Sequence, residues 1–351
     1  MKLSMRIQKS FGAFKIATDI SMDGDHIGIF GASGSGKSTL VGMLAGLLKP
    51  DNGEIVLDDD CLFSSAKGID QPPGKRRIAM VFQQHELFPH LNVKNNLLYG
   101  FKRCAPEHRR IDFGPLVEVL QLGHLLERGV NNLSGGEKQR VAIGRAALSS
   151  PRLLLMDEPL SALDDTLKFQ IIDYLKAAGE AFRIPYIFIS HSLLEMRIMA
   201  DRVLAVSAGR IESQTTAEDL ARSRMGPSPV GYINLLRLAH PRGMEGMSAY
   251  AWGGTELFIS AESNRPEALF ELSSKDIILI KQHPDAISAR NLLDCTVSGT
   301  FRSGNKVGVE LACGDGRLVA EVVPEAAREL GIEKGSRLFA AIKASAFRLL
   351  G

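Results

Sequence analysis

The sequence predicts an α/β domain built on a parallel sheet, followed by a small β-barrel domain. Apolar, strand-like runs alternate with helix-patterned stretches up to about residue 221. A turn-rich stretch at residues 226–229, Gly-Pro-Ser-Pro, then interrupts both patterns and suits a domain boundary. Beyond it, short alternating runs broken by Gly and Asp are typical of a small barrel.

In the first part, residues 1–8 form a predicted strand, and a Gly-rich turn at residues 31–36 leads into a helix that ends near Gly46. A helical block is predicted at residues 113–126. The remaining predicted strands are residues 26–30, 78–82, 153–157, 186–190 and 203–207. In the second part, a short helix opens with Pro324 and stops at Gly331. The predicted strands there are residues 256–260, 276–281, 294–298, 306–311, 317–323 and 337–343.

Composition excludes several classes of protein. The chain has 351 residues, enough for two domains, and its 45% hydrophobic content excludes a disordered chain. A net charge of +2 gives no bulk electrostatic reason to expect nucleic acid as a partner. No apolar run reaches the roughly 18–20 residues that cross a bilayer, and residues 1–8 lack the apolar region typical of a signal peptide. We therefore expect a chain that does not itself span a membrane.

The cysteines predict neither a disulfide framework nor a metal site. Cys61, Cys104, Cys295 and Cys313 lie far apart in the sequence and form no CxxC pair. Without a secretory signal, we expect reduced, structural thiols in the cytoplasm.

A phosphate-binding loop lies between a predicted strand and a predicted helix. Its pattern is G-x-x-x-x-G-K-[ST], in which glycines let backbone N–H groups turn around the phosphates. Lys37 adds a positive charge, Ser38 supplies an oxygen for Mg²⁺, and the following helix directs its positive end at the same anion. The residues predicted to bind nucleotide are Gly31, Ala32, Ser33, Gly34, Ser35, Gly36, Lys37, Ser38 and Thr39. This loop alone does not choose among kinases, GTPases and transport ATPases.

A second glycine-rich helix start lies at residues 133–140, Leu-Ser-Gly-Gly-Glu-Lys-Gln-Arg. Ser134 caps this predicted helix, and Gly135 and Gly136 expose backbone amides to an anion. The segment resembles the signature of ABC ATPases, with Glu137 where many members carry Gln. The resemblance implies an α/β P-loop NTPase core with a helical subdomain, in which residues 134–137 bind nucleotide.

Two carboxylates end a predicted buried strand, where α/β sheets place ligands. Asp157 would hold Mg²⁺ through water, and Glu158 would orient and deprotonate the attacking water as general base. The next segment, residues 161–164, resembles the D-loop of the ABC family. That resemblance implies that Asp164 contacts the nucleotide site of a second copy.

Three further positions match the family pattern. His191 follows a predicted strand and matches the switch histidine that contacts the γ-phosphate, although a lone His there is more often structural. Gln83 matches the Q-loop glutamine, which touches Mg²⁺ or the lytic water. Phe11 lies where the family places an aromatic ring against adenine, with a core role as its alternative. The resemblance covers about residues 1–221 and implies that Lys37 of one chain and Ser134 of a second copy hold each ATP.

The segment after Gln83, residues 84–93, resembles that of importer subunits, which receive a helix from a membrane permease. Phe88 and Pro89 are candidate contacts, with burial in the helical subdomain as the alternative. A soluble ABC ATPase acting on DNA or ribosomes is disfavoured, because long heptad coils and a second cassette are missing. Fused exporters would carry membrane helices. We therefore expect an importer.

The C-terminal part contains two elements that resemble those of molybdate-binding Mop domains, at residues 288–292 and 341–345. Hydroxyls, exposed amides and cationic side chains suit a doubly charged oxyanion. The predicted oxyanion residues are Ser288, Arg290, Asn291, Lys343 and Ser345. As an alternative, Arg290 and Lys343 are surface charges on a structural barrel. The stretch from residue 16 through the signature also resembles the ATPase subunit of molybdate importers. In that family the tail pairs with a second copy, and bound oxyanion can inhibit transport.

We therefore expect an ATPase domain at residues 1–228 with its helical subdomain at about 84–145, a connecting β-rich region at 229–286, and an OB-like Mop/TOBE domain at 287–351. The expected function is ATP-driven import of molybdate or tungstate, with Mg²⁺ as cofactor. The expected partners are a second copy, a permease dimer and, indirectly, an external binding protein. The expected location is the cytoplasmic face of a bacterial or archaeal membrane. Import of sulfate or another anion is the first alternative, and a non-enzymatic oxyanion store is disfavoured by the ATPase motifs.

Overall fold

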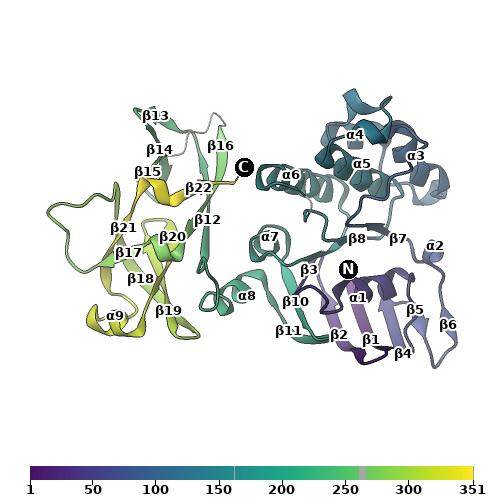
Figure 1. Ribbon diagram of the computed structural model, residues 1–351, viewed down its shortest axis with the longest axis horizontal. Coiled ribbons are helices and arrows are strands. Elements are labelled where there is room, and N and C mark those ends of the chain that lie inside the picture. The colour runs from purple at the N-terminus through teal and green to yellow at the C-terminus, as the bar shows by residue number, and fades with distance from the viewer. Residues whose placement is uncertain (162, 261–265, 351) are drawn as a thin grey trace. The chain divides into compact units, whose positions relative to one another are not determined.

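A computed structural model describes residues 1–161, 163–260 and 266–350. It divides into two compact units, Met1–Ala217 and Glu218–Gly351, and each is described by itself (Figure 1). The sequence-based boundary at residues 226–229 falls inside the second unit, after helix α8 (Ala217–Ser223). The apolar residues Ala221 and Met225 explain this placement, because they pack with Tyr232 and Val319 of the second unit.

The first unit is built on a six-stranded sheet in the order β11-β10-β3-β9-β8-β7. All five of the apolar runs predicted as inner strands form it, which confirms the α/β fold. Strands β10, β3, β9, β8 and β7 pair in parallel, and β11 pairs antiparallel at one edge. The bounds are β3 (His26–Phe30), β7 (Ile78–Val81), β8 (Leu153–Asp157), β9 (Tyr186–Ser190), β10 (Arg202–Ser207) and β11 (Arg210–Thr216). The carboxyl ends of four adjacent strands, β3, β9, β8 and β7, therefore meet at one edge.

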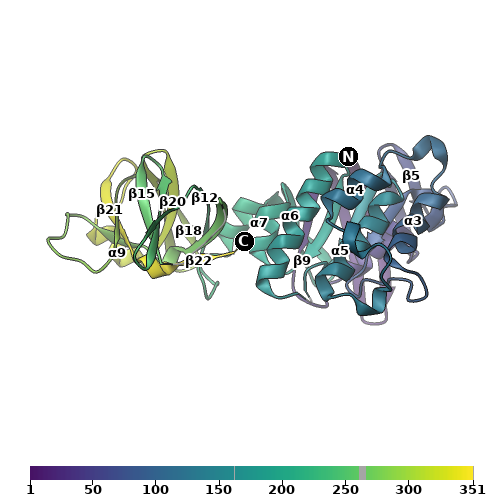
Figure 2. The ribbon, with the colours of Figure 1, turned by 90° about the horizontal axis from the view of Figure 1, so that it is seen from above.

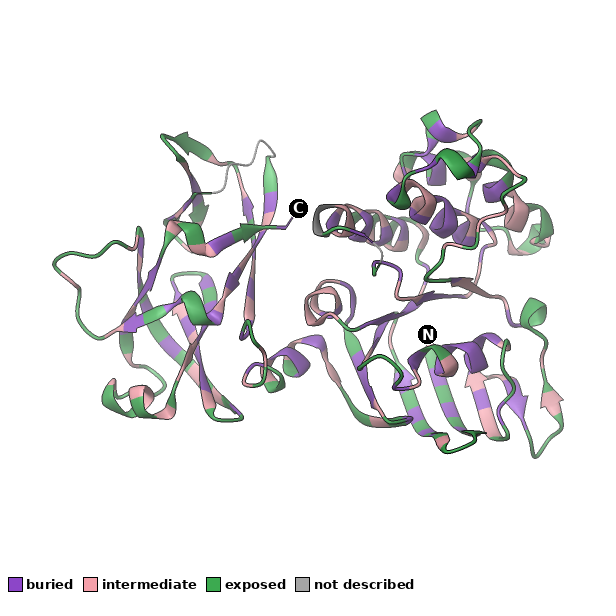
Figure 3. Ribbon diagram, in the orientation of Figure 1, coloured by how far each residue is buried: buried purple, intermediate pink, exposed green. Residues whose placement is uncertain are grey.

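A second, antiparallel sheet in the order β2-β1-β4-β5-β6 faces the same core. Its first strand alternates between buried apolar and exposed polar residues, as Figure 3 shows. Its bounds are β1 (Lys2–Phe11), β2 (Phe14–Asp23), β4 (Asn52–Leu57), β5 (Asp60–Ser64) and β6 (Ile69–Asp70). Ile7 of β1, Met43 of helix α1 (Lys37–Ala45) and Leu155 of β8 belong to one buried cluster. Because α1 packs against both sheets, it is apolar on nearly all sides.

The carboxyl end of α1 is closed by a buried cation. Arg76, in the short helix α2 (Pro73–Arg76), is 0% exposed. Its guanidinium donates to the carbonyl oxygens of Met43 at 2.8 Å and Leu44 at 3.0 Å. These are carbonyl groups that the end of a helix leaves without partners. Arg76 thus stabilises the helix that follows the phosphate-binding loop.

Among the described residues, four helices lie together in the helical part of the first unit in both ribbon views (Figures 1 and 2), and three of them pack against the fourth. They are α3 (Val93–Arg103), α4 (Phe113–Val119), α5 (Gly135–Leu148) and α6 (Asp165–Phe182), with 3-10 turns at Pro106–His108, Gly123–Leu125 and Val130–Asn132. Helix α7 (Leu193–Met199) follows β9. The block predicted at residues 113–126 is therefore α4 followed by one 3-10 turn. Among the described residues, no helix is both long and apolar enough to cross a bilayer.

The second unit is a curled antiparallel β structure, which agrees with the predicted OB-like barrel. Its sheets have the orders β12-β16-β22, β13-β14-β15 and β17-β21-β18-β19-β20. The bounds are β12 (Ile233–Ala239), β13 (Arg242–Met244), β14 (Met247–Trp252), β15 (Thr255–Ile259), β16 (Glu267–Ser273), β17 (Ile278–Ile280), β18 (Asn291–Ser303), β19 (Lys306–Cys313), β20 (Gly316–Val322), β21 (Arg337–Ile342) and β22 (Phe347–Leu349), with 3-10 turns at Ser274–Asp276 and Ala344–Ala346. Helix α9 (Pro324–Glu329) ends before Gly331, whose φ is 62°, as its sequence predicts.

The larger of two buried clusters described in the second unit joins strands from both of its halves. Leu236 of β12 and Phe270 of β16 belong to the same buried cluster as Val309 of β19. Residues 229–286, expected as a connecting region, therefore contribute strands to the same core as residues 287–350. The register between β18 and β19 shifts at Val297/Gly299, and such a bulge bends a strand and increases its twist.

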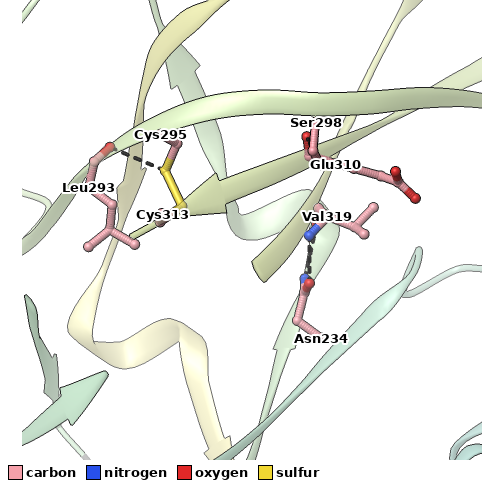
Figure 4. Close-up of a disulfide and its surroundings, with 7 residues drawn as sticks. All are labelled: Asn234, Leu293, Cys295, Ser298, Glu310, Cys313 and Val319. Atoms are coloured by element: carbon pink, nitrogen blue, oxygen red, sulfur yellow. Dashed lines mark hydrogen bonds between the residues drawn. A yellow bond between two sulfur atoms is a disulfide. The ribbon is translucent and has the colours of Figure 1, made fainter. Parts of the chain in front are cut away.

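The expectation that all four cysteines are reduced is wrong for one pair. Cys295 of β18 and Cys313 of β19 form a disulfide across adjacent antiparallel strands, with their Cα atoms 4.4 Å apart (Figure 4). The strand register places the two residues opposite each other, because the neighbouring pair is Thr296 with Ala312. Both side chains point into the core. Cys61 and Cys104 are free thiols, as expected.

Candidate functional site

The phosphate-binding loop connects β3 to α1 and is closed around the side chain of Lys37. The Lys37 ammonium is 4% exposed and donates to the carbonyl oxygens of Gly31 and Ala32, at 2.9 Å each. Gly36 has a φ of 103°, which an L side chain rarely adopts. At Gly31, a Cβ would lie 2.2 Å from the carbonyl oxygen of Val206, so the backbone path admits no side chain there. The loop therefore presents backbone N–H groups at the amino end of a helix.

The two carboxylates at the end of β8 face this loop. Asp157 Oδ1 accepts a hydrogen bond of 3.0 Å from Ser38 Oγ. Glu158 Oε1 lies 4.0 Å from Lys37 Nζ. Burial raises the pKa of Asp157, and the nearby Glu158 raises it further, while the Ser38 hydroxyl and Lys37 act against the shift. Glu158 has a φ of 45°, an uncommon value for a residue other than glycine, which marks a tight turn directly after the strand.

His191 and Gln83 complete the same edge of the sheet. His191 follows β9, and its Nδ1 lies 4.0 Å from Glu158 Oε2. Gln83 follows β7 closely, and its Nε2 donates to Ser161 Oγ at 3.1 Å. Ser161 in turn donates to the backbone carbonyl of Glu158 at 3.0 Å. The structure thus brings together side chains from four strand ends, as the parallel topology predicts.

The link through Ser161 was not anticipated from the sequence. The D-loop resemblance indicates residues 161–164 as a unit, but it does not indicate which side chain the first of them contacts. Asp164 caps α6, accepting from the backbone N–H of Leu167 at 3.0 Å. Ala162, within this segment, lies outside the described residues.

The signature segment begins α5 with a complete capping box. Ser134 Oγ accepts from the backbone N–H of Glu137 at 3.3 Å, and the Glu137 carboxylate accepts from the backbone N–H of Ser134 at 2.7 Å. This backbone hydrogen bond lowers the pKa of Glu137, against the effect of burial. The S-x-x-E spacing of the sequence predicts such a box. Glu137, expected among the nucleotide-binding residues, therefore also holds the helix start in place, and Gly135 and Gly136 follow in the first turn.

Two aromatic side chains of the first unit differ in what surrounds them. Phe11, at the end of β1, is 42% exposed, and the Lys9 ammonium lies 5.6 Å from the centre of its ring. Phe88 instead packs against Tyr99, with 4.2 Å between ring centres, and under the Arg145 guanidinium at 4.8 Å. Arg145 also donates to the carbonyl oxygen of His85 at 3.3 Å. The segment after Gln83 is thereby attached to α3 and α5, while Pro89 is exposed.

In the second unit, the predicted oxyanion residues separate into two groups. Asn291 is 2% exposed, and its side chain bonds to the backbone N–H and carbonyl of Phe258 and to the carbonyl of Ile342. Both of its amide hydrogens are used within the fold. Arg290 precedes β18 and Lys343 follows β21, at the end of the ladder where Asn291 pairs with Ile342. The exposed group consists of Ser288, Arg290, Lys343 and Ser345.

Sequence reasoning also passed over Ser190 and Glu195, which lie on either side of His191. Glu195 Oε2 lies 2.5 Å from Ser190 Oγ. Burial raises the pKa of Glu195, while Ser190, Lys168 and His191 lower it and Glu158 raises it. The second S-x-x-E spacing of the chain, at residues 192–195, could have indicated a helix start here.

The arrangement suits binding and cleavage of a polyphosphate. Ser38 and Asp157 offer hard oxygen donors 3.0 Å apart beside the loop, and these are the donors that Mg²⁺ prefers. No group of three or more His, Cys, Asp or Glu side chains that could hold a metal occurs among the described residues. Mg²⁺ does not require one, because it usually takes one or two protein oxygens together with water and substrate phosphates. The residues present therefore fit this ion.

Comparison with protein families identifies both units. The family described as ABC transporter matches residues 17–161. The TOBE domain family matches residues 287–349. The two matches lie in different structural units, in the order that the sequence predicts.

Relatives extend over nearly the whole chain. The molybdenum import ATP-binding protein ModC of Rhizobium meliloti is 38% identical over 98% of this chain and 98% of its own length. The protein of the same name from Paramagnetospirillum magneticum is 36% identical over 97% of this chain and 96% of its own. Among solved structures, the dimeric post-hydrolysis state of the ATP-binding cassette MJ0796 bound to ADP and Pi is 27% identical with a TM-score of 0.51, and the match covers 62% of this chain and 99% of that one.

Proposed function

Because this chain belongs to the family of molybdenum import ATP-binding proteins, we propose that it drives the import of molybdate by hydrolysing ATP. The chain is an ABC-type ATPase with a TOBE domain. Support for molybdate comes from relatives that match the chain from end to end, including the second unit. Tungstate is a tetrahedral dianion like molybdate, and we expect it to be accepted as well. Import of sulfate is the alternative that the experiment below tests.

The hydrolytic step rests on one observation: Glu158 lies 4.0 Å from Lys37 Nζ and 4.0 Å from His191 Nδ1. In our proposal the loop of residues 31–39 holds the phosphates of ATP, and Lys37 exchanges its carbonyl partners for phosphate oxygens. Glu158 takes a proton from the attacking water as general base. His191 contacts the γ-phosphate, and Gln83 positions the water or the metal. Phe11, which is exposed at the end of β1, stacks on the adenine ring.

Ser38 and Asp157 would hold Mg²⁺, with Gln83 as a further oxygen donor. When bound, this ion neutralises charge that develops on the phosphate oxygens. The raised pKa of Asp157 reflects a carboxylate buried beside another acid, and a bound cation relieves that cost.

A second copy would complete the site. The amino end of α5, with Ser134, Gly135 and Gly136, offers backbone N–H groups and a positive helix end. Within one chain this helix start serves no phosphate of its own loop in our proposal; it serves the ATP of the partner. Asp164 at the start of α6 would contact the partner's site. The dimeric state named for the MJ0796 cassette supports this arrangement.

We further propose that the segment after Gln83 receives a permease dimer, which places the chain at the cytoplasmic face of the membrane. Pro89 is exposed, and Phe82 before Gln83 is 36% exposed, although it is large and apolar. The ring of Phe88 is partly covered by Tyr99 and Arg145. In our proposal it therefore holds the segment after Gln83 in place rather than contacting the permease. An external binding protein would deliver the oxyanion to the permease.

The TOBE domain would bind molybdate or tungstate through Ser288, Arg290, Lys343 and Ser345, with a second copy completing the site. The support is that Arg290 and Lys343 each adjoin the last residue pair of the β18–β21 ladder, Asn291 with Ile342, and remain exposed. Asn291 would shape this end of the barrel rather than contact the anion. Bound oxyanion would inhibit transport.

The import proposal is tested with the chain reconstituted in vesicles with its permease and binding protein. We expect ATP-dependent molybdate uptake that a tenfold excess of sulfate leaves nearly unchanged. Replacing Lys37 by Ala together with Ser134 by Ala should abolish both uptake and phosphate release. Normal turnover by this double variant would exclude the two-copy site, and uptake of sulfate in preference to molybdate would exclude the proposed substrate.

The regulatory proposal is tested by adding millimolar molybdate to the same vesicles. We expect slower ATP hydrolysis in the parent protein and none of this slowing in an Arg290→Ala variant. Arg337→Ala is the matched control, because Arg337 is an exposed arginine at the opposite end of β21. Inhibition that survives Arg290→Ala, or that Arg337→Ala removes equally, would contradict the assignment.

A further inference from the structure

Two helices at the ATP site begin with the same spacing, Ser-x-x-Glu. In α5 the spacing gives a complete capping box between Ser134 and Glu137. In α7 only half of the box forms: Ser192 Oγ accepts from the backbone N–H of Glu195 at 3.3 Å. In a complete box, the Glu195 carboxylate would accept from the backbone N–H of Ser192. It is directed elsewhere.

The hydroxyl group of Ser190 lies between these two groups. The backbone N–H of Ser192 donates to Ser190 Oγ at 3.0 Å, and Ser190 Oγ lies 2.5 Å from Glu195 Oε2. Because the Ser190 oxygen accepts from an N–H, its own hydrogen is available to the carboxylate. A chain of hydrogen bonds therefore runs from the last residue of β9 to the first turn of α7. The bond from the Ser192 N–H to Ser190 Oγ spans His191.

Burial makes the arrangement more than a surface cap. Ser190 is 3% exposed, and burial raises the pKa of the Glu195 carboxyl. A buried carboxylate costs stability unless hydrogen bonds compensate it, so the Ser190 hydroxyl contributes directly to keeping Glu195 in place. The charged groups that act on Glu195 are Lys168, His191 and Glu158. The carboxylate thus lies within the electrostatic environment of the ATP site.

The side chain of His191 depends on this backbone for its position. The side chain is 64% exposed, and its Nδ1 lies 4.0 Å from Glu158 Oε2. We propose that Ser190 and Glu195 are positioning residues for ATP hydrolysis, which fix the turn carrying His191 so that its ring meets the γ-phosphate. This inference rests on the proposed role of His191, and it extends that role to two residues that do not touch the substrate.

The test measures steady-state ATP hydrolysis by the full-length protein. We expect Glu195→Ala and Ser190→Ala each to lower kcat about tenfold, because small displacements of a reacting group are costly, while KM for ATP changes less than twofold. Glu195→Gln retains an acceptor for the Ser190 hydroxyl and should keep more than half of the parent kcat. Two separate single variants keep the test valid if one of them folds poorly.

A double-mutant comparison separates positioning from general loss of structure. If Glu195 acts through His191, then Glu195→Ala should have no further effect on kcat in a protein that already carries His191→Ala. Ser273→Ala is the control. Ser273 caps the 3-10 turn Ser274–Asp276 of the second unit by accepting from the backbone N–H of Lys275 at 3.1 Å. Its loss should lower thermal stability comparably without lowering kcat.

The outcomes distinguish this inference from the proposed function. An inactive His191→Ala variant beside fully active Glu195→Ala and Ser190→Ala variants would overturn the inference and leave the role of His191 intact. Equal losses of kcat from Glu195→Ala with and without His191 would also overturn it, since the effect would then be structural. A fully active His191→Ala variant would remove the role of His191 and the inference together.

Discussion

The two units of this chain hold their functional residues in different ways. In the first unit, Lys37, Asp157, Glu158 and His191 come from three strand ends and lie within 3–4 Å of a neighbour in the group or of the loop. In the second, the candidate oxyanion residues are exposed, apart from Asn291, whose side chain is used within the fold. The difference teaches that one chain can assemble most of a hydrolytic site, whereas a binding site for a small anion needs a second surface to enclose it.

The largest effect is expected in the assembled site. Glu158→Gln removes the proposed general base and should lower ATP hydrolysis on the order of 10²–10⁴-fold, while the uncharged side chain leaves ATP binding intact. The protein should then accumulate as an ATP-bound dimer, measured by size-exclusion chromatography with and without ATP. Normal turnover by this variant would show that Glu158 is not the general base. The first unit would then not be known to assemble the groups that cleave ATP.

The disulfide provides a perturbation confined to the second unit. Replacing Cys295 and Cys313 together by Ala should destabilise that unit by about 3 kcal/mol, as expected for opening a loop of about 18 residues. Trp252, the one tryptophan of the chain, lies in β14 and reports urea unfolding of this unit. ATP hydrolysis should stay unchanged. If neither the double substitution nor added dithiothreitol shifts the urea unfolding transition, the disulfide contributes nothing to the stability of this unit.

Asn291 and Arg290 are adjacent and should behave in opposite ways. Asn291→Ala leaves buried backbone groups of Phe258 and Ile342 without partners and should cost about 1–3 kcal/mol in the Trp252 transition. Arg290→Ala should change stability by less than about 0.5 kcal/mol but remove the response to molybdate. If Asn291→Ala were neutral for stability and abolished the molybdate response, Asn291 would belong to the binding site after all.

The smallest effect concerns the stability that the first unit loses by burying the Asp157 carboxylate at the ATP site. Burial raises the pKa of Asp157 above that of an unfolded chain, so the ionised carboxylate destabilises the nucleotide-free fold at neutral pH. Asp157→Asn should therefore raise the melting temperature by about 1–2 °C at pH 7.5. The gain should fall as the pH is lowered through the raised pKa, where the parent carboxyl becomes protonated. An equal gain at all pH values, measured by calorimetry, would contradict this origin.

Much of the first unit could be predicted from its sequence. Apolar runs such as residues 153–157 became strands with the expected bounds, because buried parallel strands are continuously apolar. Parallel pairing then brings Gln83, Glu158 and His191 to one edge. The predicted cap by Ser134 is likewise present, and the structure adds the reciprocal bond from Glu137. These features depend on local sequence and on a general rule of topology.

The remaining features depend on register between distant segments. Nothing in the spacing of Cys295 and Cys313 reveals that they lie opposite each other, because the bulge near Gly299 sets the pairing of β18 with β19. The use of Asn291 within the fold follows from the approach of β15, which is 33 residues away in the sequence. The diversion of Glu195 to Ser190 required side-chain positions that the S-x-x-E spacing leaves open.

Helix α5 has different contacts at its two ends. Its capping box presents Ser134 at the start, and Arg145, one turn from the other end, contacts the segment that follows Gln83. A helix of this length spans about 20 Å, so a shift at one end moves the other as a rigid body. In a symmetric pair, the nucleotide that contacts Ser134 would therefore change the position of the segment after Gln83 in the same copy, although that nucleotide is bound by the loop of the other copy. Occupancy of the two sites would then be cooperative, with hydrolysis rising more steeply than in proportion to ATP concentration.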